Sequence, residues 1–221
     1  MKRSETMEKF VKRVEDNQDK CNTYKKYCDQ YKLALRHEFY LEAIMIDYAM
    51  MEDRLLSLLS HLGVTTIANN KLTVSKFCRS SLREFLGLKP NGAIRLDQIS
   101  TKRNILKLFL NLSEEQIQEL PNETLRLYYV RVQNALYAYG GKFPLSQLLD
   151  DIDAWCDKRN QYVHALFNKN YIALQEGLED YVKTGMSLAE GVHGIVQFVK
   201  PSTAKNPRTR VYNIRKEFRI K

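Results

Sequence analysis

The segment from Leu35 to Leu62 constrains the fold most, because apolar residues recur along it at three- and four-residue spacing. That spacing places side chains on one face of a helix. The first row is Leu41, Ile44, Tyr48, Met51, Leu55, Leu58 and Leu62, and a second row on the opposite face is Leu35, Phe39, Ile46 and Met50. Gly63 gives a stop signal. The pattern predicts one long central helix that is covered on two faces and interrupted by two acids, Glu42 and Asp53.

The rest of the chain also favours helices, since only nine glycines and five prolines occur among 221 residues. Apolar periodicity and capping signals predict one helix or a helix pair over 5–33, and helices from Thr73 or Ser75 to 88 and over 99–110, 123–139, 145–167 and 171–199, with a loop at 63–71. The segment 113–116 resembles a capping box and predicts a helical turn or two before Pro121, and Pro144 is expected in the first turn of the helix over 145–167. Only the C-terminal tail shows the alternation of apolar and polar residues that is typical of a strand. Its apolar residues Tyr212, Ile214, Phe218 and Ile220 share one parity. The sequence therefore predicts an all-α fold, a helical bundle with a short extended or β-like C-terminal tail.

The charge is concentrated at the C-terminus. From Lys200 onward, eight basic residues and one acid contribute +7 of the formal net charge of +9. This contrast predicts two parts, a helical domain over 1–199 and a basic tail over 200–221. A single strand cannot stand alone, so the tail must lie across its own body, pair with a second copy, or become ordered on a partner. If it mediates assembly, deletion of 205–221 lowers the oligomeric state.

Several classes of protein are not expected from this sequence. No run of about 18 apolar residues and no secretory signal occurs, so we expect a cytoplasmic protein without a membrane partner. The four cysteines form no Cys-x-x-Cys pair and predict reduced structural thiols, with no metal site. Phosphate-binding and dinucleotide-binding glycine patterns are absent from the sequence, as is the Gly-x-Ser-x-Gly nucleophile motif. We therefore expect no cofactor.

An arginine and a histidine lie near the end of the helix predicted over 145–167. Its apolar residues Leu145, Leu148, Ile152, Trp155, Cys156, Tyr162, Val163 and Leu166 cover one arc. Arg159 projects from the middle of that arc, and His164 lies at its edge. A charged guanidinium on a core-facing stripe needs an acid partner or a pocket around it. Glu42 and Asp53 are the acids that we expect to pair with Arg159. By itself, such a pair is most often a structural ion pair and a surface histidine.

The hexapeptide Arg159-Asn160-Gln161-Tyr162-Val163-His164 resembles the Arg-x4–6-His motif of the HEPN family, the higher eukaryotes and prokaryotes nucleotide-binding domain. The segment 42–54 is also similar to the first long helix of bacterial HEPN-like proteins. The resemblance implies a helical bundle that forms a homodimer and cleaves RNA without a metal at a site shared between two copies. It also implies toxin–antitoxin or anti-phage defence, with an antitoxin or other regulatory protein as a partner.

The same resemblance implies catalytic roles for two residues. Arg159 would hold the scissile phosphate and stabilise its developing charge, and His164 would transfer protons. Asn160 would orient the phosphate or the histidine. Toxin members that are silenced by adenylylation carry a tyrosine two residues after the histidine, where this chain has Leu166. That control is therefore not expected here.

A second reading assigns no catalysis to the chain. In this reading it is a helical module that keeps the motif to bind RNA, a nucleotide or a protein partner. Cleavage of RNA in EDTA would favour the endoribonuclease, and binding without turnover, weakened steeply by salt, would favour the module.

Overall fold

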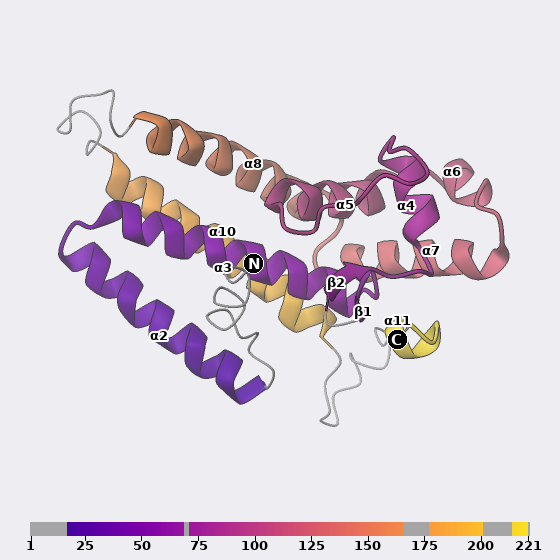
Figure 1. Ribbon diagram of the computed structural model, residues 1–221, viewed down its shortest axis with the longest axis horizontal. Helices are drawn as coiled ribbons and strands as arrows, with labels where there is room; N and C mark the ends of the chain where they lie inside the picture. Colours follow the sequence, from indigo (N-terminus) through magenta and orange to yellow (C-terminus); the bar gives the residue numbers. More distant parts are fainter. Residues whose placement is uncertain (1–16, 69–70, 166–176, 201–213, 221) are drawn as a thin grey trace, which may run out of the picture. The chain divides into compact units, whose positions relative to one another are not determined.

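The computed structural model describes residues 17–68, 71–165, 177–200 and 214–220 (Figure 1). The chain forms two compact units, Met1–Ile46 and Asp47–Lys221, which are described separately. The division into 1–199 and 200–221 stays a prediction. Within the described residues, no helix is long and apolar enough to cross a membrane.

The first unit contains helix α2 (Asn17–Arg36) and the beginning of helix α3 (Tyr40–His61), which continues into the second unit. The prediction of one unbroken helix from Leu35 to Leu62 is wrong at its start. Glu38 takes a left-handed conformation with φ 58°, and the amide of Phe39 donates to the carbonyl of Ala34. A left-handed residue ends an α-helix, so α3 begins only at Tyr40.

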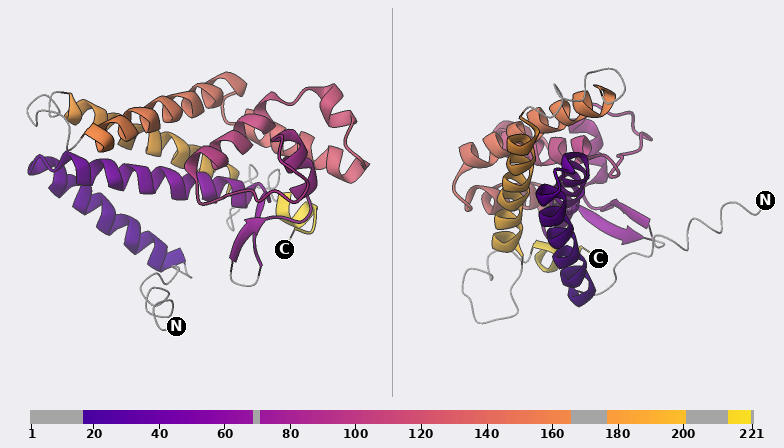
Figure 2. Two further views of the ribbon diagram at one scale, coloured as in Figure 1. Left: turned by 45° about the horizontal axis from the view of Figure 1, so that its top comes forward. Right: turned by 90° about the vertical axis from the view of Figure 1, so that its left-hand side faces the viewer.

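The second unit is built mainly from helices, which confirms the predicted all-α fold class. After α3 come strands β1 (Thr65–Ala68) and β2 (Lys71–Val74) and helices α4 (Arg79–Phe85), α5 (Ile99–Asn111), α6 (Glu114–Gln118), α7 (Glu123–Tyr137), α8 (Lys142–Ala165), α10 (Leu178–Val199) and α11 (Ile214–Glu217). Helices α8 and α10 run side by side in opposite directions, and α5 packs against both α7 and α8 (Figures 1 and 2).

The region predicted as a loop, 63–71, instead begins a hairpin. Strands β1 and β2 pair antiparallel, with Thr65 opposite Val74. The threonines of both strands fit a pleated surface well, which the loop interpretation overlooked. The predicted helix start at Thr73 or Ser75 is also wrong, because α4 begins only after Cys78, which makes no side-chain cap.

The C-terminal tail also differs from its prediction. Residues 214–217 form the short helix α11 rather than a strand. Ile214 and Phe218 are four residues apart, a spacing that places two side chains on the same face of a helix as well as on the same face of a strand. The amide of Phe218 donates to the carbonyl of Ile214, as in a helical turn. Arg219, with φ 51°, ends the turn. Ile214 and Ile220 are buried, so of the three predicted placements the described tail lies across its own unit.

Local signals near the middle of the chain predict the helix starts well. Ser113 and Gln116 form the predicted capping box at α6. Asn122 caps α7 through the amide of Leu125 at 2.8 Å. Pro144 lies in the first turn of α8, as predicted, where it removes no helical hydrogen bond. These starts fix the register of α8, and with it the faces on which Arg159 and His164 lie.

Candidate functional site

Arg159 is half-buried and lies near the end of α8, opposite α3 of the same unit. Its guanidinium carbon lies 4.5 Å from the centroid of the Tyr48 ring, a cation–π contact. Its Nη1 donates to Oδ1 of Asn160 at 3.0 Å. Tyr48 was predicted only as an apolar residue of the first helical row. The structure shows that an aromatic face supports the half-buried guanidinium.

His164 lies in the last described turn of α8, and its side chain is exposed. It lies five positions after Arg159 in the helix, about 7.5 Å along the axis and about 140° around it. Asn160 was predicted to orient a phosphate or the histidine, and in the structure its carboxamide accepts a hydrogen bond from Arg159. Leu166, the position of the regulatory tyrosine in toxin members, lies outside the described residues.

Aromatic side chains of α8 and α10 surround the base of this helix end. The rings of Trp155 and Tyr181 stack at 5.0 Å, and the tilted ring of Tyr162 also lies 5.0 Å from that of Tyr181. The Trp155 indole donates to the carbonyl of Tyr181 at 3.0 Å, and the Tyr181 hydroxyl donates to the carbonyl of Trp155 at 2.5 Å. Lys158 lies 5.4 Å from the Tyr181 ring centroid. These reciprocal contacts hold α8 to α10 one turn before Arg159.

The two acids predicted to pair with Arg159 lie in different units. Asp53 is half-buried on α3 in the second unit. Glu42 is exposed in the first turn of α3 and belongs to the first unit. Their pairing with Arg159 stays a prediction.

Asp47, which the sequence analysis did not single out, is the most unusual acid of the second unit. Its side chain is fully buried, and neither carboxylate oxygen has a hydrogen-bond partner. Burial raises the pKa of Asp47 to about 8, although the charge of Arg54 acts in the opposite direction. An aspartate among the apolar residues of a central helix was the available signal, because such residues are seldom buried without a partner.

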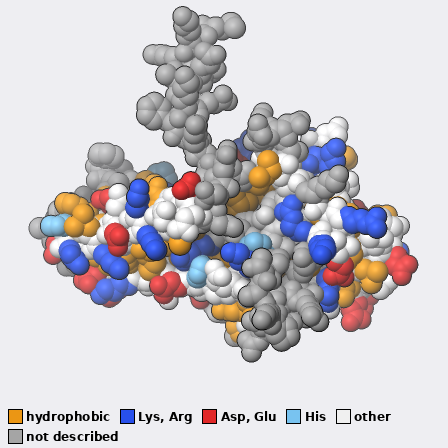
Figure 3. Space-filling view, turned by 90° about the horizontal axis from the view of Figure 1, so that it is seen from below, with side chains coloured by type: hydrophobic (Ala, Val, Ile, Leu, Met, Phe, Trp, Pro, Cys, Tyr) orange, Lys and Arg blue, Asp and Glu red, His pale blue; other side chains and the backbone are white. Residues whose placement is uncertain are grey.

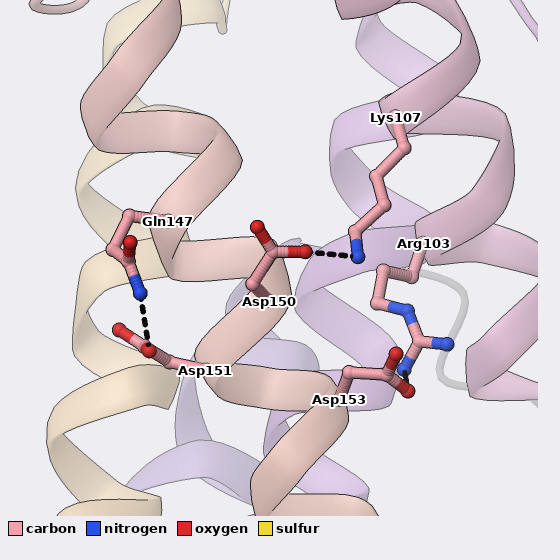
Figure 4. A network of polar contacts seen from close by, with 6 residues as sticks. All are labelled: Arg103, Lys107, Gln147, Asp150, Asp151 and Asp153. Atoms are coloured by element: carbon pink, nitrogen blue, oxygen red, sulfur yellow. Dashed lines mark hydrogen bonds and ion pairs between the residues drawn. The ribbon is translucent and has the colours of Figure 1, made fainter.

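The charged side chains of α5 are paired, in contrast to Asp47. Arg103 and Lys107 form ion pairs with Asp153 and Asp150 of α8 (Figure 4). Lys102 donates to Glu52 of α3 at 2.6 Å. The structure places the carboxylate of Asp153 on Arg103. This face of α8 is therefore held to α5 by ion pairs.

Cys156 lies between Trp155 and the Arg159 turn and is buried. Burial raises the pKa of its thiol to about 11, with the charge of Arg103 opposing the shift. The thiol is therefore neutral near pH 7 and a poor nucleophile. This agrees with the structural role predicted for the cysteines.

The surface of the described chain gives two further observations. Basic side chains lie among acidic and apolar ones on the face drawn in Figure 3. A groove of about 700 Å³ lies between α7 and α11, and one of about 180 Å³ is lined by residues of β2, α4 and the loop that follows; neither is lined by Arg159 or His164. Among the described side chains, no group of three His, Cys, Asp or Glu residues is placed to hold a metal ion.

Comparison with known proteins adds no family to these observations. No protein-family model, no curated protein and no solved structure matches the chain. The similarity of residues 159–164 to the HEPN motif therefore stays a prediction from sequence.

Proposed function

We propose that the protein is a metal-independent endoribonuclease of the HEPN type, in which Arg159 and His164 of two copies form one site. The observation that carries the proposal is the support of Arg159. Its guanidinium rests on the Tyr48 ring and bonds to Asn160, while His164 is exposed at the end of the same helix. A fixed cation and an accessible imidazole are the groups that cleavage by a neighbouring 2′-hydroxyl requires.

Each residue has a separate role in this reaction. His164 of one copy removes the proton of the 2′-hydroxyl, whose oxygen attacks the adjacent phosphorus. His164 of the other copy protonates the leaving 5′-oxygen, so the products are a cyclic phosphate and a free hydroxyl. Arg159 stabilises the charge that develops on the phosphate oxygens. One histidine per copy supplies only half of this chemistry, which is why the proposal includes a dimer.

In this proposal a second copy supplies the other half of the site around the bound phosphate. A cytoplasmic role in toxin–antitoxin or anti-phage defence, with an antitoxin or other regulatory protein as partner, belongs to the same proposal and rests on the sequence resemblance alone.

The test is cleavage of labelled RNA by the full chain in EDTA. We expect fragments with cyclic-phosphate ends, and a loss of at least a hundredfold in Arg159→Ala and in His164→Ala, as for removal of a general acid–base group. Arg95→Ala is the matched control, because Arg95 is exposed in the loop before α5. Activity that survives both site substitutions would refute the site. RNA binding without cleavage would indicate the non-catalytic module instead.

A further inference from the structure

Asp47, Trp155 and Gly185 meet where α3, α8 and α10 of the second unit come together, and we name this place the three-helix joint. A Cβ atom added at Gly185 would lie 2.7 Å from Oδ2 of Asp47 and 2.7 Å from Cζ2 of Trp155. Such distances are shorter than any ordinary contact. The joint therefore has no room for a side chain at 185, and the Asp47 side chain is fully buried there.

Few charged groups act on Asp47 in this joint. Arg54 lies two turns further along α3 and favours the ionised form. From α10, the Tyr181 hydroxyl senses the Asp47 charge, which contributes to the raised pKa of that tyrosine. From α8, Trp155 presents an uncharged indole, and Lys158 lies against the Tyr181 ring. Burial outweighs Arg54, so Asp47 is mostly protonated at pH 7 and ionises in mildly alkaline solution.

The joint is directly connected to the support of Arg159. Tyr48, whose ring carries the guanidinium, follows Asp47 in α3. Trp155, one helical turn before Arg159, packs at the same joint and is tied to Tyr181 by two hydrogen bonds. A change in the spacing of α3, α8 and α10 at Asp47 would therefore move both the Tyr48 ring and the turn of α8 that bears Arg159.

We propose that Asp47 is a proton-controlled positioning residue for Arg159. The neutral carboxyl allows the three-helix joint to close and holds Tyr48 beneath the guanidinium. When the O–H bond of Asp47 breaks and the proton passes to solvent, the remaining carboxylate needs water, so the joint must open and Arg159 loses its support. The effect on RNA cleavage rests on the function proposed above, and the opening of the joint does not.

Trp155 is the single tryptophan of the chain, so its fluorescence reports the joint without a label. We expect the emission of the full protein to change between pH 6 and pH 10 with a midpoint near 8. Asp47→Asn removes this transition because its side chain cannot ionise. Asp97→Asn, an exposed position before α5, keeps it. An equal transition in Asp47→Asn, or none in the wild-type protein, would overturn the proposal.

A second measurement does not depend on the folding of any variant. In wild-type protein labelled with 13C at aspartate carboxyls, one carboxyl resonance is expected to titrate near pH 8, far above the ordinary value of 3.8. If every aspartate carboxyl titrates below pH 6, the proton-controlled joint is refuted.

The pH profile of RNA cleavage tests the positioning role. The rate of the wild-type protein relative to Asp47→Asn is expected to fall about tenfold from pH 7 to pH 9, as a single ionisation near 8 requires. Effects of pH that are common to both proteins cancel in this ratio. A constant ratio would refute the positioning of Arg159. A fluorescence transition near pH 8 in a wild-type protein that cleaves no RNA would refute the nuclease while supporting the joint.

Discussion

Two regions in the described part of the second unit bury charged groups in different ways. Where α5 packs on α8 and α3, each buried cation has an acid beside it: Arg103 pairs with Asp153, and Lys102, only 1% exposed, pairs with Glu52. At the three-helix joint, Asp47 is equally buried but neither of its oxygens has a hydrogen-bond partner. The first region holds its charges by pairing, and the second holds its acid by protonation.

The difference separates structural charges from candidate functional ones. A buried pair stays ionised over a wide pH range, so it fixes the spacing of helices and responds little to solution conditions. A buried acid without a partner changes its charge close to neutral pH, and the cost of that charge falls on the helices around it. We therefore expect the two regions to respond differently to the four changes that follow.

The largest effect is expected from removing the ionisable group at the joint. The unfolded chain titrates Asp47 near 3.8 and the folded protein near 8, so between these values the folded state binds more protons. Its contribution to the free energy of unfolding consequently falls as pH rises from about 4 to about 8, by on the order of 4 kcal/mol. In Asp47→Asn this fall should disappear. Urea denaturation at several pH values measures it, and Asp97→Asn should behave as wild type.

Local sequence signals predicted the frame of the site but not its supports. The capping box at Ser113, Pro144 at the start of α8, and the apolar arc around Arg159 depend on neighbours in the chain, so they can be read from the sequence. Tyr48 under Arg159 and Gly185 against Asp47 depend on how distant helices approach each other. No spacing rule contains that information, and the sequence analysis therefore did not single out Asp47.

The error in the secondary structure of the tail has a related cause. In the tail, the four-residue spacing of Ile214 and Phe218 fits both a strand and a helical turn. Packing against the rest of the second unit decides between the two. Phe218 lies edge-on to Tyr128 at 5.5 Å, and Arg215 donates to the carbonyls of Ser60 and Thr65. These contacts join residues far apart in sequence. Short segments with ambiguous patterns are set by such contacts more than by propensity.

The next largest effect is expected at the paired region. Glu52→Ala leaves the Lys102 ammonium buried without its acid, which should cost about 3 kcal/mol of the free energy of unfolding. The double substitution Glu52→Leu with Lys102→Met removes both charges and should recover most of the loss, because an apolar pair can replace a buried ion pair. Urea denaturation near pH 7 measures both. If the double variant is as unstable as Glu52→Ala, the loss comes from packing and the comparison fails.

A smaller effect should come from steric pressure on the joint. Gly185→Ala brings a methyl group against the Trp155 ring and Asp47, and we expect a loss of about 1.5 kcal/mol after the helix preference for alanine is included. Gly191→Ala, on the same helix, meets only the Leu148 side chain at 3.1 Å, which can move, so little change is expected. Thermal unfolding of the two variants, monitored by circular dichroism, measures the difference in their stability. Equal stability would mean that the joint is loosely packed.

The smallest effect is expected where a charge pair reaches solvent. Lys107 pairs with Asp150, whose side chain is more than half exposed, so water already screens their attraction. Lys107→Ala should therefore change the free energy of unfolding by only about 0.5 kcal/mol, and 1 M salt should remove most of that difference. Urea denaturation at low and high salt measures both. A loss as large as that of Glu52→Ala would show that an ion pair stabilises the packing of α5 on α8 whether or not it is buried. The two regions would then differ only because Asp47 has no hydrogen-bond partner, and not because of burial.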